Sequence, residues 1–438
     1  MNDSGFLEKR FKLSANKTTV KTEIMAGITT FVSMAYILAV NPIILSEAGM
    51  DSGAVFTATI LASIVATLIM AFYANYPFVL SAGMGLNAYF AYVVVLQNGQ
   101  TWQFALTAVF IEGLIFLLLT FVNVREAIVN AIPINLKNAV SAGIGLFIAF
   151  IGLQASNIII NDDATLLRLG NLKSPEAITC IIGLIVIAIL HMKKVQGSLL
   201  IGIIVSTIVG IPLGITNFNG LFSLPPSIAP TALAFKNIGL SNILTSEMLV
   251  VVITFLFVDL FDTIGTLIGA ASKANMLDDE GKLPNVKQAL FADAVGTTVG
   301  AVLGTSTVTT FVESTAGISE GGRTGLTSLT SACLFALALF FAPLFTAIPA
   351  AATAPALIVV GLFMVENIMK IDFTDFTEGF PAFLTIITMP LAYSIGDGLM
   401  MGIISYPVCK ILSGRAKESS VVMYILAVLF ILKIIFMT

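Results

Sequence analysis

The sequence contains very little charge. Asp, Glu, Lys and Arg together make up 11% of its 438 residues, whereas soluble domains carry about a quarter charged residues. Hydrophobic residues make up 57%, and the mean hydropathy is +1.01. This composition excludes a soluble globular enzyme and predicts an all-α, multi-pass membrane protein whose surroundings are the lipid bilayer.

Histidine and cysteine are also scarce. The single histidine, His191, stands beside two lysines at the end of an apolar run, so a histidine proton relay within the membrane is excluded. The three cysteines, Cys180, Cys333 and Cys409, are isolated in apolar surroundings with no paired spacing. Neither a disulfide framework nor a metal site is suggested, and we expect no metal and no cofactor.

Basic residues are concentrated before the first apolar run, between Lys9 and Lys21. A short basic arm beside a membrane span indicates topology rather than nucleic-acid binding, and it places the segment 1–23 in the cytoplasm. The first apolar run is too long for a cleavable signal and lacks a small-residue cleavage site. We therefore expect a protein of the cytoplasmic membrane with no nucleic-acid partner.

Fourteen apolar segments are candidates for membrane spans, each of which needs about 20 residues when it is a simple helix. They are 24–46, 54–74, 82–96, 103–121, 137–153, 176–190, 197–211, 247–271, 288–303, 311–320, 326–345, 350–369, 379–394 and 398–412. A Pro-rich external connection, 212–246, separates two sets of seven. Because seven is odd, the two repeats, 24–211 and 247–412, are predicted to be inverted. The C-terminal segment 413–438 contains one more apolar run, 420–437, which is either a fifteenth span or a helix lying against the bundle.

The third segment of each half is irregular. Residues 76–92 and 306–317 each combine a short β-like run with glycines and the start of a helix. Such backbone is tolerated at membrane depth only where it is buried or lines a cavity, and a matching pair in two halves indicates a transporter site. We expect a short β-strand followed by a half-helix in spans 3 and 10. The amides at Ala82, Gly83 and Ser314 are then candidates to bind a ligand, although the glycines could instead serve close helix packing.

Three aspartates stand within apolar runs. Asp259 and Asp262 are three residues apart and share one helix face, with Thr263 and Thr266 close to it. Asp293 lies in the next span. No Lys or Arg lies within these apolar runs, and acids at membrane depth are costly and usually functional. Asp259, Asp262 and Asp293 are therefore proton-coupling candidates, since burial favours the protonated form of a carboxyl. The alternative for Asp293 is a structural role in orienting its neighbour.

Carboxylates accept hydrogen bonds, whereas helix-start amides donate them. A site with both suits a planar, mostly neutral ligand with N–H donors on one edge and carbonyl or ring-nitrogen acceptors on another. A purine nucleobase such as guanine or hypoxanthine has this pattern. Phe90, Phe257, Phe261 and Phe311 are available to stack on the base. For any one of them the alternative is packing in the core or against lipid, and Phe261 is the candidate placed at the site.

At these residues the sequence resembles the nucleobase–cation symporter 2 superfamily, and within it the AzgA-like purine permease branch. The resemblance covers nearly the whole chain. It is carried by TEIMAGITTFVSMAYILAVNP (22–42), SAGMGLNAYFAY (81–92), FLFVDLFDTIGTLIG (255–269) and TSTVTTFVESTAGISEGGRTGLTSL (305–329).

The resemblance implies fourteen spans divided into a core domain and a gate domain, with the site between them. The core would be formed by 24–121 and 247–345, and the gate by 137–211 and 350–412. It implies proton-coupled uptake of guanine, hypoxanthine or adenine by a permease, not an enzyme, and a homodimer.

The resemblance also assigns residues: Asn87, Asp259, Asp262 and Glu313 match site positions, and Glu313 matches the direct contact to the base. In one respect the chain departs from the wider superfamily, which often has His or Asp one turn after the acid of span 8. Here Asp262 is followed by Thr266, so the proton carrier cannot be assigned by position.

Three other functions fit the sequence less well. A sulfate- or bicarbonate-type anion transporter would bring an anion against Asp259, Asp262 and Glu313 without a compensating cation, which is electrostatically unfavourable. An intramembrane aspartyl protease would need a Gly-x-Gly-Asp motif, and the nearest match at 394–397 lacks the first glycine. A channel filter is usually built symmetrically from several subunits, and nothing in the sequence requires one.

Overall fold

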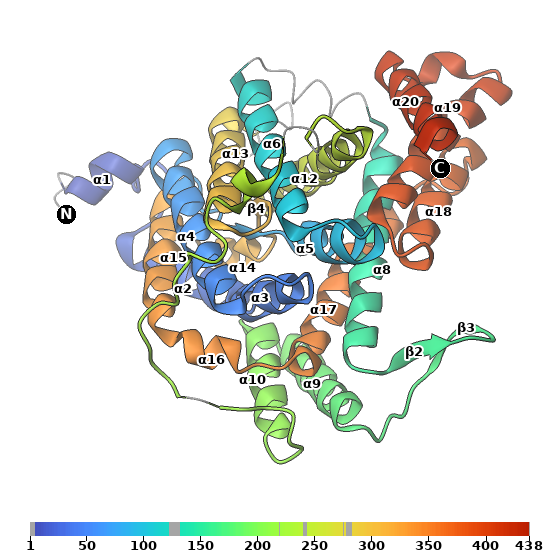
Figure 1. The fold of residues 1–438 in the computed structure, drawn as a ribbon. Helices are drawn as coiled ribbons and strands as arrows, with labels where there is room; N and C mark the ends of the chain where they lie inside the picture. Colours follow the sequence, from blue (N-terminus) through green and yellow to red (C-terminus); the bar gives the residue numbers. More distant parts are fainter. Residues whose placement is uncertain are drawn as a thin grey trace.

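The protein is almost entirely helical, as predicted (Figure 1). The computed structural model describes residues 5–121, 132–218, 220–239, 243–274, 276 and 283–437. Within these residues, eight helices are long and apolar enough to cross a membrane, and four shorter apolar helices accompany them. The chain is therefore a multi-pass membrane protein.

The elements of the first half form seven consecutive segments. They are α2 (Val20–Met34) with α3 (Ile37–Glu47); α4 (Ser52–Ile69) with η1 (Met70–Ala74); β1 (Leu80–Ala82) with α5 (Met84–Ala88) and η2 (Tyr89–Gln97); α6 (Trp102–Phe121); α8 (Ile134–Ala155); α9 (Pro175–Met192); and α10 (Ser198–Gly210).

The second half repeats this order. Its segments are α12 (Ser246–Lys273); α13 (Val286–Leu303); β4 (Val308–Thr310) with α14 (Ser314–Ser319); α15 (Gly325–Ala338) with α16 (Ala342–Thr346); α17 (Ala350–Val365) with η5 (Glu366–Lys370); α18 (Phe376–Leu391); and α19 (Ile395–Leu412). In both halves the third segment is a strand followed by a short helix. The expected strand and half-helix in spans 3 and 10 are thus confirmed.

The two strands pair with each other across the halves. The antiparallel register is Leu80↔Thr310, Ser81↔Thr309 and Ala82↔Val308. The pairing is extended by the Gly83 N–H donating to the Thr307 carbonyl and the Phe311 N–H donating to the Val79 carbonyl, both at 3.0 Å. Backbone groups at membrane depth must find partners within the protein, and each strand supplies them for the other.

Hydroxyl side chains satisfy the outer edges of this two-stranded sheet. The Leu80 N–H donates to Thr67 Oγ1 of α4, and the Val308 N–H donates to Thr297 Oγ1 of α13, both at 3.2 Å. Thr297 Oγ1 in turn donates to the Val308 carbonyl at 3.1 Å. These hydrogen bonds therefore connect the small sheet to one helix of each half, and each of these backbone groups has a partner.

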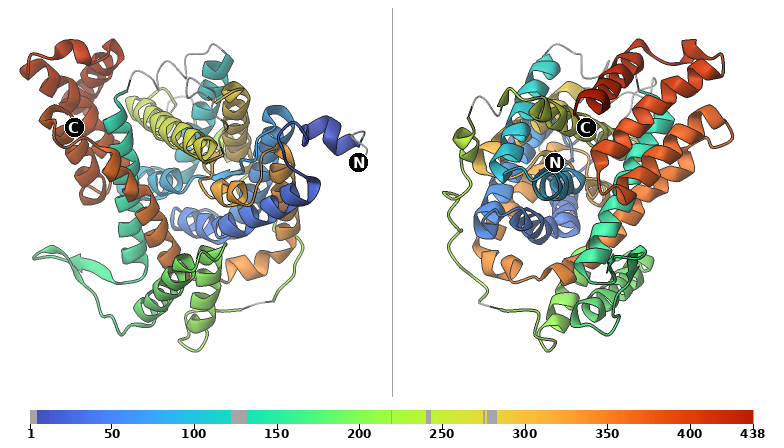
Figure 2. Two further views of the ribbon diagram at one scale, coloured as in Figure 1. Left: turned by 180° about the vertical axis from the view of Figure 1, so that it is seen from behind. Right: turned by 45° about the vertical axis from the view of Figure 1, so that its right-hand side comes forward.

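The helices form two groups around this centre. α4 packs against α13 and α15, and α6 against α12 and α13, close to the strands, while α8 packs against α17, α18 and α19. In Figure 1 and Figure 2 the second group extends away from the strand pair, with α18, α19 and α20 at its far end. This grouping follows the predicted core and gate, whose exact residue boundaries stay predictions.

Two local features differ from the sequence expectation, and a third concerns a run for which the sequence left two alternatives. The first span is not one helix over 24–46: α2 and α3 are separated by a turn at Ala35 and Tyr36. The segment after α8 forms a hairpin of β2 (Ile159–Asp162) and β3 (Leu166–Leu169), which was not predicted. The run 420–437 is a helix, α20 (Val421–Met437), that packs against α19.

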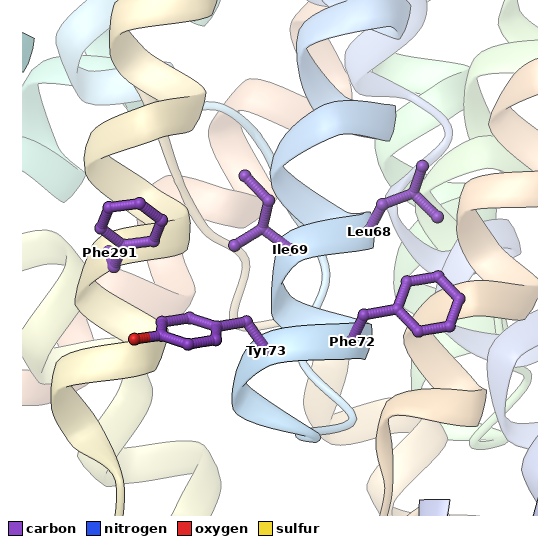
Figure 3. A pocket seen from close by; sticks show the side chains of 5 residues that line it. All are labelled: Leu68, Ile69, Phe72, Tyr73 and Phe291. Carbon is purple, nitrogen blue, oxygen red and sulfur yellow. The ribbon is translucent and has the colours of Figure 1, made fainter. Parts of the chain in front are cut away.

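A surface hollow lies on the outside of the first group. It has a volume of about 580 Å³ and is lined by Leu68, Ile69, Phe72 and Tyr73 of α4 and η1 together with Phe291 of α13 (Figure 3). Its lining is apolar, as expected of a surface that faces lipid. None of the predicted acids lines it, so it is not the ligand site.

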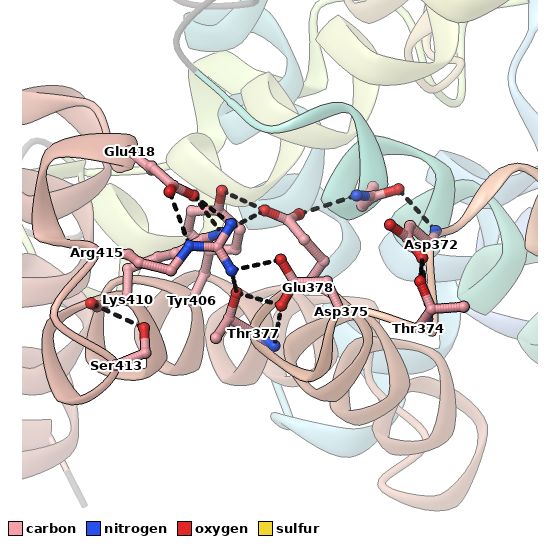
Figure 4. Close-up of polar contacts among 11 residues, drawn as sticks. Asp372, Thr374, Asp375, Thr377, Glu378, Tyr406, Lys410, Ser413, Arg415 and Glu418 are labelled. Atoms are coloured by element: carbon pink, nitrogen blue, oxygen red, sulfur yellow. Dashed lines mark hydrogen bonds and ion pairs between the residues drawn. The ribbon is translucent and has the colours of Figure 1, made fainter.

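The second group contains a buried cation. Lys410 of α19 has no exposed surface, and its Nζ lies 2.7 Å from Glu378 Oε1 of α18 and 2.9 Å from Glu418 Oε2 (Figure 4). The Tyr406 hydroxyl donates to Glu378 at 2.9 Å. The cluster joins α18 and α19 to the turn η6 (Ala416–Glu418) that precedes α20.

Arg415 extends this cluster to the start of α18. Its guanidinium binds Asp375 at 2.6 Å and Glu418 at 2.7 Å. Hydrogen bonds from Thr377 and Arg415 lower the pKa of Asp375 to about 2, and those from Arg415 and Lys410 lower the pKa of Glu418 to about 2. Both carboxylates are therefore ionised at neutral pH and fix the end of α19 against α18.

Lys410→Met should destabilise the protein by about 3 kcal/mol, because it leaves the mostly buried Glu378 carboxylate without its cation. Thermal unfolding in detergent measures the loss. The double variant Lys410→Met/Glu378→Gln should recover at least half of it, since the unpaired charge is then gone. An unchanged unfolding temperature in Lys410→Met would contradict a stabilising role for this cluster.

Candidate functional site

The predicted acids gather around the strand pair in two layers. Asp262 of α12 and Glu313, which follows β4, are partly exposed. Asp259 of α12 and Asp293 of α13 are completely buried. We call the first pair the front acids and the second pair the rear acids.

Each front acid is held by a hydroxyl. The Tyr36 hydroxyl donates to Glu313 Oε1, and Thr309 Oγ1 of β4 donates to Asp262 Oδ2 at 3.4 Å. The two front acids also lie close enough to interact electrostatically. The site therefore presents two carboxylates, which are hydrogen-bond acceptors when ionised.

Tyr36 was not among the residues selected from the sequence. It occupies the turn between α2 and α3, and its side chain is completely buried. The turn brings its hydroxyl to Glu313, which lies in the other half of the chain. A tyrosine inside an apolar run needs a partner for its O–H, and that need was the signal available in the sequence.

Asn87 supplies a donor at the same centre. The side chain of this α5 residue is completely buried, and its Oδ1 accepts a hydrogen bond from the Ser306 hydroxyl. Its Nδ2 has no hydrogen-bond partner within the part of the chain that the structure describes. A buried amide that lacks a partner is costly, and a bound ligand with an acceptor group would satisfy it.

The predicted helix-start amides are largely engaged within the protein. The Gly83 N–H donates to Thr307 of the other half, and the Ser314 N–H donates to the Phe311 carbonyl at 3.1 Å. The Ser314 hydroxyl accepts from the Val79 N–H at 3.0 Å. Ala82 is part of β1. Substrate binding by Ala82, Gly83 and Ser314 stays a prediction, and the side chains carry the chemistry described here.

The position of Gly83 has a steric reason. A Cβ atom there would lie 2.9 Å from Thr309 Oγ1, closer than real Cβ contacts. Glycine therefore permits the close approach of the two strands.

Aromatic side chains of the predicted set lie in the core. Phe90, Phe257 and Phe311 are each at most 5% exposed and belong to the main hydrophobic cluster. The side chain of Phe261 lies outside the described residues, so its stacking on a ligand stays a prediction.

The rear acids share one hydroxyl. Thr263 Oγ1 lies 3.0 Å from Asp259 Oδ1 and 2.7 Å from Asp293 Oδ1. A further buried acid, Glu112 of α6, accepts a hydrogen bond from Thr307 at 2.9 Å. Among the residues with described positions, no group of three or more His, Cys, Asp or Glu side chains could hold a metal ion. The polar chemistry here is therefore that of carboxyls, hydroxyls and one amide.

Known proteins resemble the chain over nearly its full length. The model of the Permease family matches residues 21–435. The guanine/hypoxanthine permease PbuG of Bacillus subtilis is 45% identical over 98% of this chain and 99% of its own. The adenine permease AdeP of Escherichia coli is 42% identical over 99% of this chain and 96% of its own.

A solved structure supports the fold. The transmembrane domain of a cyanobacterial bicarbonate transporter, BicA, superposes with a TM-score of 0.64 over 87% of this chain and 97% of that one, at 18% identity. This likeness confirms the architecture of core and gate and says nothing about the substrate. The chain is a membrane transporter, not an enzyme, and it belongs to the permease family of the nucleobase–cation symporter 2 superfamily.

Proposed function

We propose that this chain takes up purine nucleobases (guanine, hypoxanthine or adenine) across the cytoplasmic membrane together with protons, by alternating access. The observation that carries the proposal is the buried Asn87 amide, which follows β1 and whose Nδ2 lacks a partner in the described structure. The front acids supply acceptors at the same strand pair, because Asp262 accepts from Thr309 of β4 and Glu313 follows β4. One donor and two acceptors at one centre suit a neutral heterocycle that presents both kinds of group.

The purine edge fits this arrangement. Guanine and hypoxanthine carry a ring N–H next to the O6 carbonyl, so Glu313 can accept from the N–H while Asn87 donates to an oxygen or ring nitrogen. Adenine offers an amino donor next to ring-nitrogen acceptors. The relatives named for guanine/hypoxanthine and for adenine are 45% and 42% identical to this chain. Their names support a purine and leave the choice among purines to competition experiments.

A bicarbonate or sulfate transporter is the second candidate, because the bicarbonate transporter BicA shares the fold. The front acids argue against it. An anion placed beside Asp262 and Glu313 would be repelled by both when they are ionised, and repulsion is strong where water is excluded. The residues at the site therefore favour a neutral base.

Proton coupling is supported by the number of acids near the strand pair. Asp259, Asp262 and Asp293 lie on two adjacent helices, and a carboxyl at this depth readily takes up a proton. In this proposal the proton is the only coupling ion, the basic N-terminus faces the cytoplasm by the positive-inside rule, and the protein forms the homodimer that the family resemblance implies.

Glu313→Gln should weaken binding of the preferred purine by about 10- to 100-fold, because a hydrogen bond to a charged acceptor contributes about 1.5–3 kcal/mol. Binding to purified protein in detergent measures the effect. Glu320→Gln is the matched control, since Glu320 is an exposed acid at the far end of α14. Normal affinity in Glu313→Gln would remove this residue from the site.

Tyr36→Phe should raise the KM for the purine about 3- to 10-fold, since it removes the hydroxyl that orients the Glu313 carboxylate. In Glu313→Gln/Tyr36→Phe the effects should not add, because both changes break the same interaction. Additive effects of the two substitutions would show that Tyr36 acts independently of Glu313.

A further inference from the structure

Thr263 contacts both rear acids, but its single O–H can donate to only one of them. The second contact becomes a hydrogen bond only if one of the two carboxyls carries a proton. Thr263 Oγ1 lies within hydrogen-bond distance of Asp259 Oδ1 and of Asp293 Oδ1, at 3.0 and 2.7 Å. All three side chains are completely buried. A threonine hydroxyl has one O–H to donate, and an ionised carboxylate can only accept.

If both acids were ionised, one of these two contacts would join two acceptors. The arrangement becomes two hydrogen bonds when one carboxyl is protonated. That carboxyl then donates to Thr263 Oγ1, and Thr263 donates to the other, ionised carboxylate. Two acids that share a site rarely ionise together, because the second charge is repelled by the first.

We propose that Asp259, Thr263 and Asp293 form one proton-carrying unit, in which the two acids share a single proton through the threonine hydroxyl. The proposal rests on the proton coupling suggested above and names the carrier. In this proposal Asp259 and Asp293 carry the proton in turn, and Thr263 relays the proton between them.

The relay needs no further reactant. When the Asp259 carboxyl gives its proton to Thr263 Oγ1, the original O–H bond of Thr263 breaks and that proton passes to Asp293. The threonine stays neutral throughout, and one proton has moved from α12 to α13. The reverse transfer restores the starting state.

Other acids surround this unit. Asp262 follows Asp259 on α12 and interacts electrostatically with Asp293. Glu112 contributes a buried carboxyl from α6, which packs against both α12 and α13, and Glu313 lies beyond Asp262. The sequence has no Lys or Arg from 237 to 272 or from 288 to 322. Negative charge from these neighbours favours keeping the shared proton in place.

Strand β4 connects the unit to the front acids. One turn after Asp293, Thr297 of α13 holds both the N–H and the carbonyl of Val308. The next residue of the strand, Thr309, binds the front acid Asp262. Loss of the shared proton would leave two negative charges, one of them one turn from the threonine that binds this strand, and the strand leads to Glu313, which gives a route for coupling.

The test compares Thr263→Val, which keeps the shape and removes the hydroxyl, with Thr263→Ser, which keeps the hydroxyl. Thr298→Val is the matched control, because the Thr298 hydroxyl donates to the Ala294 carbonyl of its own helix. Each variant is reconstituted in liposomes. Purine exchange at equal pH on both sides reports binding and conformational change, and accumulation driven by a pH gradient reports coupling.

Thr263→Val should keep exchange within about threefold of the wild type and lose at least about 10-fold in accumulation. Thr263→Ser and Thr298→Val should accumulate the purine as the wild type does. Accumulation by Thr263→Val at the wild-type level would overturn the relay.

A second measurement is independent of transport. Infrared difference spectra between wild type and Asp293→Asn, and between wild type and Asp259→Asn, should each lose the C=O band of a protonated carboxylic acid. If neither substitution removes such a band, the shared proton does not exist. If wild-type liposomes move no purine while the band is present, the proposed substrate is wrong and the proton site stands.

Discussion

The structure depends on the hydrogen bonds between two short strands that come from different halves of the chain. β1 and β4 are each only three residues long, too short to be stable alone. At membrane depth their N–H and C=O groups have no water to bind, so each strand must have the other, together with the hydroxyls of Thr67 and Thr297. Neither half can complete this centre without its partner, and the acids and Asn87 come together only when the halves have folded onto each other.

Because of this constraint, the side chains around the strands have different roles. Hydroxyls that lie next to the strands hold the acids in place: Thr309 and Tyr36 bind the front pair, and Thr263 bridges the rear pair. The front acids are partly exposed, while the rear acids are completely buried. In the proposed function the base and the proton occupy separate sites that hydrogen bonds connect through β4, since Thr297 binds Val308 and Thr309 binds Asp262.

Much of this could be predicted from the sequence, because its signals were local. Acids in apolar runs and β-like segments followed by glycine depend on a few adjacent residues, and they predicted Asp259, Asp262, Asp293 and the strands, whereas the site role of Glu313 came from the family resemblance. The missed features depend on contacts between distant residues. The turn at Tyr36 interrupts a run that is apolar throughout, so hydropathy could not reveal it. Thr263 is one of many threonines until the fold places Asp293 beside it, and Lys410 is a span-end lysine until Glu378 and Glu418 enclose it.

The most direct test of the central claim, that the front acids and Asn87 form a purine site coupled to protons, is uptake of labelled hypoxanthine into cells that express this chain. Uptake is measured with and without a proton uncoupler, and with an excess of guanine, adenine, xanthine, uracil or bicarbonate. We expect the uncoupler to abolish accumulation and one or two purines to compete, with no effect of bicarbonate. A well-expressed protein that takes up no base, or that accumulates base regardless of the uncoupler, would contradict the claim.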